Sequence, residues 1–147
     1  MFFLKKAQSL RIPNLLSLVT VCCLTTLSCS QPEESRVYFE NINGGDSLTL
    51  INIGFGIREY KVGPAGNVGE EMGHHHLLIS RNSIAEGVVI PNNNNHIQLG
   101  GGETQTDLNL SPGSYVITLQ FADGLYKSYG EKMSASVEIT MKNFFGG

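Results

Sequence analysis

The sequence predicts an all-β domain, an immunoglobulin-like antiparallel β-sandwich of about seven strands. Short apolar runs, several of them alternating, follow one another after residue 36, and clusters of Gly, Pro, Asn and Asp separate them every eight to twelve residues or so. Beyond the N-terminal segment, no run of about ten residues has the i, i+3, i+4, i+7 spacing of an amphipathic helix. A small open barrel is the alternative architecture.

Length and composition fit one folded domain. The chain has 147 residues, of which 41% are hydrophobic and 16% are charged. Disordered chains contain fewer apolar residues and carry more charge. A chain of this size can also bury a single core without further cross-links.

The N-terminus has the pattern of a bacterial export signal. Lys5, Lys6 and Arg11 form a basic region, and an apolar, hydroxyl-rich run from Leu15 to Leu27 follows. This run is shorter than the ~20 apolar residues that span a bilayer. Residues 1–28 are therefore interpreted as a lipoprotein-type signal peptide.

Cys29 decides the type of signal. Leu27 and the small Ser28 precede it, as in a lipobox, whose cysteine becomes the lipidated first residue of the mature protein. Residues 29–36 then form the lipidated end and a short polar tether, and residues 37–147 form the domain. We expect a protein of the bacterial cell envelope that is anchored to a membrane at Cys29, on the periplasmic face or at the outer membrane. If Cys29 is not lipidated, the protein is secreted.

Cysteine and charge exclude two classes of function. Cys22, Cys23 and Cys29 all lie in or at the end of the signal, so the domain has no thiol for a disulfide, a metal or a nucleophile. From Ser30 onward seven basic and thirteen acidic residues remain, a net charge of 7 − 13 = −6. Without a cluster of Lys and Arg, nucleic-acid binding is not expected.

The first half of the domain predicts two antiparallel strands and a long loop. Val37 to Phe39 are strong strand formers, and Asn43 to Asp46 form a turn that needs positive φ. Leu48 to Phe55 alternates apolar and polar residues at period two. Gly63 to Gly69 is too rich in Gly and Pro for a regular element, and its length favours a functional or mobile loop.

The second half predicts further short strands with turns between them. The apolar Leu77 to Ile79 indicates a central strand that is covered on both faces. Residues 107–121 read as a β-hairpin, because two alternating runs flank Ser111-Pro112-Gly113. Strands are expected at residues 74–80, 85–90, 96–99, 103–110, 114–121 and 133–141.

Several motifs together resemble one bacterial family of exported domains, the domain of unknown function numbered 4399. The string Gly73-His74-His75-His76-Leu77-Leu78-Ile79 is its most specific feature. The resemblance covers nearly the whole mature chain and includes these further segments: Val37-Tyr38-Phe39, Asn43-Gly44-Gly45-Asp46, Phe55-Gly56, Pro64-Ala65-Gly66, Ile90-Pro91, His96-Ile97, Gly101-Gly102 with Thr104, Leu110-Ser111-Pro112-Gly113, Ala122-Asp123-Gly124, Ser128-Tyr129-Gly130 and Ser134. It implies export and a β-rich domain, without an established activity.

The chain departs from this resemblance at two positions. Similar members often have a histidine in the loop after the Ala-Asp-Gly segment and another two residues after the equivalent of His96. Here Tyr126 and Gln98 stand at those places. A metal site that depended on the extra imidazoles would be weaker in this protein.

The histidine run is the main candidate site. Residues two apart in a strand share a face, so His74 and His76 project together and His75 projects to the other side. Two imidazoles ~6.5–7 Å apart at their Cβ atoms can reach one metal ion. His96 is the expected third ligand, and Glu71, Met72, Glu103 or Asp123 could complete the site. Imidazole suits copper and zinc, and the exported compartment and the nearby Met72 and Met133 favour copper.

Other interpretations of the same residues stay open. The favoured function is a non-catalytic binding module, but the histidines could instead brace the carbonyl groups of the Gly-rich loops in a structural or interaction domain. They could also line a pocket for a polar ligand. A metal-assisted hydrolase, with Glu71 or Glu103 as the base, is a further alternative.

Overall fold

A computed structural model describes residues 35–48 and 51–143. The expected signal peptide, the lipidation site Cys29 and most of the tether lie outside these described residues. Within the two ranges, no helix is long and apolar enough to cross a membrane.

The described chain consists almost entirely of strands. A single short 3-10 helix, Glu131–Met133, leads directly into the last strand. In chain order the strands are β1 (Val37–Phe39), β2 (Asp46–Leu48), β3 (Ile51–Ile57), β4 (Lys61–Val62), β5 (Met72–Ile79), β6 (His96–Gln98), β7 (Gln105–Leu108), β8 (Gly113–Ala122) and β9 (Ser134–Met141).

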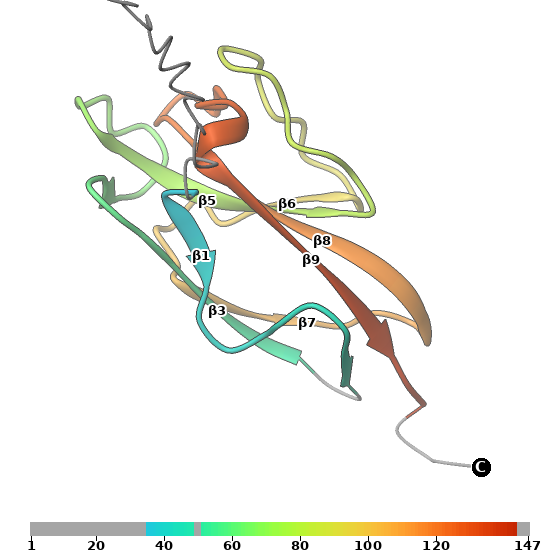
Figure 1. Cartoon of the computed structure of the whole chain (residues 1–147). Helices are drawn as coiled ribbons and strands as arrows, with labels where there is room; N and C mark the ends of the chain where they lie inside the picture. Colours follow the sequence, from blue (N-terminus) through green and yellow to red (C-terminus); the bar gives the residue numbers. More distant parts are fainter. Residues whose placement is uncertain (1–34, 49–50, 144–147) are drawn as a thin grey trace, which may run out of the picture. The chain divides into compact units, whose positions relative to one another are not determined.

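The strands form two sheets. One has the order β1-β3-β7, and the other has the order β2-β9-β8-β5-β4, with β6 also paired to β5. In Figure 1, β1, β3 and β7 lie in one layer and β5, β8 and β9 lie in the other. The predicted all-β, sandwich-like architecture with antiparallel sheets is confirmed. The immunoglobulin-like topology stays a prediction, with which this division of strands is compatible.

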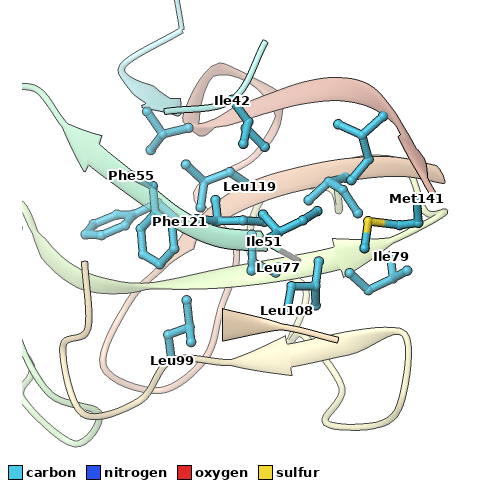
Figure 2. Packing of buried hydrophobic residues seen from close by; sticks show 14 of the residues in the cluster. Ile42, Ile51, Phe55, Leu77, Ile79, Leu99, Leu108, Leu119, Phe121 and Met141 are labelled. Carbon is cyan, nitrogen blue, oxygen red and sulfur yellow. The ribbon is translucent and has the colours of Figure 1, made fainter. Parts of the chain in front are cut away.

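The core lies between the two sheets. Alternate residues of β3, β5 and β8 supply most of it, among them Phe55, Leu77 and Leu119, whose side chains have no exposed surface. Figure 2 shows these side chains in one cluster with Leu108 of β7 and Met141 of β9. A second, smaller cluster of Leu78, Ile90 and Ala122 lies apart from this core.

Two predicted elements are wrong. Residues 107–121 are not a hairpin, because β7 pairs with β3 and β8 pairs with β5 and β9 in the other sheet. The turn at Ser111-Pro112-Gly113 therefore connects the two layers. Residues 85–90 are not a strand, and Val89 forms only an isolated bridge to Lys127.

The segment between β5 and β6 instead crosses the outer face of the larger sheet. Side chains of β8 hold its backbone, since Gln120 Oε1 accepts from the Ile84 N–H at 3.0 Å and Thr118 Oγ1 donates to the Arg81 carbonyl at 2.8 Å. Ser128 Oγ donates to the Ile84 carbonyl at 2.7 Å. Hydrogen bonds from polar side chains replace the backbone hydrogen bonds of a paired strand. Apolar and polar residues therefore do not need to alternate in this segment.

The edges of the larger sheet were also not predicted. β2 pairs in parallel with β9, and the two-residue β4 pairs in parallel with the start of β5. Neither run is long enough for its apolar pattern to identify its partner.

Candidate functional site

β5 positions the histidine run inside the protein. It pairs with β8 along one side, and β4 and β6 share its other side. Every residue from Gly73 to Ile79 is buried as a result. His74 lies opposite Ala122, and His76 lies between Gln120 on β8 and Gln98 on β6.

His75 projects into the main core. Its ring centroid lies 4.9 Å from that of Phe55 and 5.0 Å from that of Phe121, both in edge-on arrangements. Burial lowers the pKa of His75 to about 4, with a smaller contribution from His74. The imidazole is therefore neutral at neutral pH and packs as an aromatic ring.

His74 and His76 lie together on the opposite face, as their spacing predicts. Their ring centroids are 4.8 Å apart and the ring planes are tilted by 36°. We call these two residues the histidine pair. Tyr126 covers the pair, with its ring nearly perpendicular to both imidazoles at centroid distances of 5.1 Å and 6.2 Å.

Tyr126 reaches this position through an uncommon backbone conformation. Its φ is 65°, a left-handed value that costs a residue with a side chain about 1 kcal/mol or more. The carboxylate of Asp123 fixes the loop, because Oδ1 accepts from the N–H groups of Leu125 and Lys127 at 2.8 Å each. Tyr126 N–H donates to the Asp123 carbonyl at 3.0 Å.

The ring nitrogens of the histidine run have no hydrogen-bond partner within the described ranges. This holds for Nδ1 and Nε2 of His74, His75 and His76, all of which are buried. A buried polar group without a partner costs about 1–3 kcal/mol, and most such groups in proteins are paired. The hydrogen bonds to loop carbonyls that a bracing role requires are therefore not among the contacts of these rings.

Both imidazoles of the pair are expected to be neutral. Burial, together with smaller contributions from the neighbouring histidines, lowers the pKa of His76 to about 3. Burial also lowers the pKa of His74, while the negative charges of Asp123 and Glu103 raise it. A neutral imidazole has the lone pair that a metal ion or a hydrogen-bond donor needs.

His96 lies on the same sheet but is engaged elsewhere. It pairs with Leu78 in the register of β5 and β6, two positions beyond the pairing of His76 with Gln98. Its Nδ1 lies 2.9 Å from Asn93 Oδ1. In the described part of the chain, no group of three or more His, Cys, Asp or Glu residues is placed to hold a metal ion. The structure thus brings His74 and His76 together and does not bring His96 into such a group.

The other predicted ligands also have contacts of their own. Glu103 Oε2 accepts from the Gly101 N–H at 2.9 Å, and Asp123 holds its turn. The side chain of Met72 lies against the loop residues Gly63 and Gly69. Met133 is buried in the main core, and Glu71 is exposed.

Sequence reasoning missed the role of Gln120. Its side chain is fully buried beside His76, and Nε2 donates to the carbonyls of Gly130 at 2.9 Å and Met133 at 3.1 Å. The available signal was its place in strand 114–121, where period two puts Gln120 on the face opposite Phe121. Residues 80–95 cover and bury that face, and local sequence does not predict this cover.

Comparison with known proteins identifies a family. The family model described as a domain of unknown function, DUF4399, matches residues 53–142, a range that contains the histidine run, Gln98 and Tyr126. No curated protein and no solved structure matches the chain.

Proposed function

We propose that this chain, which belongs to the family of domains of unknown function DUF4399, is a non-catalytic module that binds one transition-metal ion through His74 and His76. Copper is the favoured ion and zinc the second. The metal is proposed as a bound ligand and not as a reaction centre.

One observation carries this proposal: two neutral, fully buried imidazoles face each other, and their nitrogens have no protein partner within the described residues. Zinc–nitrogen bonds are about 2.0–2.1 Å, which places a ring centre about 3 Å from the ion. Two rings that share an ion can then have centres up to about 6 Å apart. The centroid distance of 4.8 Å in the histidine pair fits this range.

The two positions at which the resemblance implies histidines in similar members lie beside the pair. Gln98 pairs with His76 in the register of the sheet, and the Tyr126 ring lies against both imidazoles. Histidines at these two places would adjoin the pair. In this chain His74 and His76 hold the ion, and Tyr126 covers it.

His75 has a different role in this proposal. Its ring is enclosed by Phe55 and Phe121 on the core side of β5, which favours a packing role. For this histidine alone we propose a structural role, which is packing in the core and not bracing of loop carbonyls.

The proposed location follows from the N-terminal sequence. A signal peptide at residues 1–28 and lipidation at Cys29 would attach the domain to a bacterial membrane. The net charge of −6 beyond the signal, given by seven basic and thirteen acidic residues, is unfavourable for nucleic acid. The proposed partners are therefore a membrane and a metal ion.

A titration of the mature protein tests the function. Cu(I), Cu(II) and Zn(II) are added to the wild type and to the His74→Ala/His76→Ala variant, with His96→Ala as the matched control. We expect one ion to bind per chain, the double variant to lose binding and the control to keep it. Equal affinity of the wild type and the double variant would show that the site lies elsewhere. Loss of binding in His96→Ala would restore the three-histidine site.

A further inference from the structure

We propose that the histidine pair is selective for a univalent d10 ion, Cu(I), over divalent ions. This inference rests on the proposed function, since it specifies the ion that His74 and His76 hold. Three features of the site carry it: the charge of its donors, their number and the apolar cover above them.

The donors that face the ion are uncharged. Asp123, whose field reaches His74, accepts two backbone hydrogen bonds within its own loop. Glu103 accepts from Gly101 and is exposed to solvent, which screens its charge. Neither carboxylate is a donor to the ion, so their negative field at His74 compensates the positive charge of the ion only in part.

A buried site with little compensating charge favours an ion of low charge. The cost of moving an ion from water into a site of low polarity rises with the square of its charge, so a divalent ion costs about four times as much as a univalent one of similar size. Both imidazoles have no exposed surface. This difference opposes Zn(II) and Cu(II) more strongly than Cu(I).

The number of donors points the same way. Zinc takes four ligands almost always in structural sites, whereas Cu(I) is stable with two or three. The pair supplies two imidazoles, and His96 is bonded to Asn93. Met72 has the same parity along β5 as the pair, and its side chain packs against Gly63 and Gly69; a thioether that served as the third donor would select Cu(I).

The cover over the pair is mainly aromatic and apolar, although Gln120 and Gln98 flank His76 in the sheet. The Tyr126 ring contacts both imidazoles, and the small cluster of Leu78, Ile90 and Ala122 continues along the same face. Such surroundings replace the water that a divalent ion would retain. They also limit the access of oxidants to a bound Cu(I).

The test compares ions of different charge on the mature protein. Cu(I) is titrated without oxygen against a chromophoric competitor, Ag(I) serves as a redox-inert univalent probe, and Zn(II) and Cu(II) are titrated in parallel. We expect Cu(I) and Ag(I) to bind one per chain, each about 100-fold or more tighter than Zn(II) and Cu(II) after correction for the competitor. Met72→Leu should weaken Cu(I) binding by about tenfold and leave Zn(II) unchanged.

Nuclear magnetic resonance of the wild type adds a readout that does not depend on the folding of a variant. Ag(I) is diamagnetic, and it should shift the ring nitrogens of His74 and His76 while those of His96 stay in place. If Zn(II) or Cu(II) binds the same two rings as tightly as Cu(I) and Ag(I), the charge selectivity is wrong and the proposed function stands. If no ion shifts these rings, both proposals fail.

Discussion

Gly73 and Ala122 lie so close across β5 and β8 that a Cβ atom on Gly73 would overlap with the Ala122 carbonyl oxygen. The same atom would lie 3.0 Å from Phe121 Cε1. Only glycine fits at the start of the histidine run, because both obstacles belong to a central strand and cannot move independently. The closeness of these two backbones fixes the register in which His74 meets Ala122.

Gly73→Ala should destabilise the domain by about 3 kcal/mol or more, since the clash involves a main-chain atom. Urea unfolding of the mature protein measures the loss. Gly69→Ala is the matched control, because its Cβ would make ordinary contacts of 3.6–4.0 Å with Met72 only. Equal effects of the two substitutions would contradict the close approach.

Stability should fall as the solution becomes acidic. The pKa of His75 is about 4 and that of His76 about 3 in the folded protein, against 6.5 for an ordinary histidine. Above pH 6.5 both states are neutral at these residues and no difference arises. As pH falls below 6.5, the unfolded chain takes up protons that the folded chain excludes. Each histidine then lowers the free energy of unfolding by up to about 1.4 kcal/mol per pH unit, until the pH reaches the pKa of that histidine in the folded protein.

His75→Leu tests how much of this pH dependence belongs to one residue. Leucine removes the titrating ring and has a similar volume between Phe55 and Phe121, so the loss of stability between pH 6.5 and 4 should shrink by about half. Denaturant midpoints at several pH values provide the measurement. If the stability of His75→Leu depends on pH as strongly as that of the wild type, other groups control acid unfolding.

Gln120→Leu should cost about 2–4 kcal/mol, because it leaves the Ile84 N–H and the Met133 carbonyl without their partner, while the Gly130 carbonyl keeps the Met133 N–H. Hydrogen exchange should also rise at Ile84, where the covering segment loses its attachment. Gln98→Leu is the control, since this half-buried side chain makes one bond of 3.4 Å to Ile90. Gln98→Leu should lower the free energy of unfolding by less than about 1 kcal/mol.

Asp123→Asn distinguishes a turn former from a metal ligand. Asparagine keeps the Oδ1 acceptor for Leu125 and Lys127, so stability and copper affinity should both stay close to the wild type. Asp123→Ala removes the acceptor and should cost about 1–2 kcal/mol. Calorimetric unfolding and metal titration of both variants provide the comparison. A large loss of affinity in Asp123→Asn would make this carboxylate a ligand.

Local sequence predicts the alternation of the site but not its surroundings. The two faces of His74 and His75 follow from the period of a strand, which needs only neighbouring residues. Tyr126 could not be placed in the same way. A left-handed tyrosine is rare, and its contact with His74 depends on where the Asp123 turn meets β5.

The fold shows the same division. The strand at Leu108 and the strand that begins at Gly113 are evident from alternation, but both would also suit a hairpin. Their partners are chosen by long-range packing, which places Leu108 against β3 and Leu119 against β5. The segment near Ile84 is not predicted from local sequence, because side chains of β8 hold it. Gln120 does so at a separation of 36 residues and Thr118 at a separation of 37.

The short outer strands of the larger sheet affect how the protein behaves at high concentration. β2, β4 and β6 are described as three, two and three residues long, and β2 and β4 run parallel to their neighbours. A strand of another molecule would find few consecutive main-chain groups to pair with there. Crowding should therefore not drive these chains to join through the edges of the larger sheet.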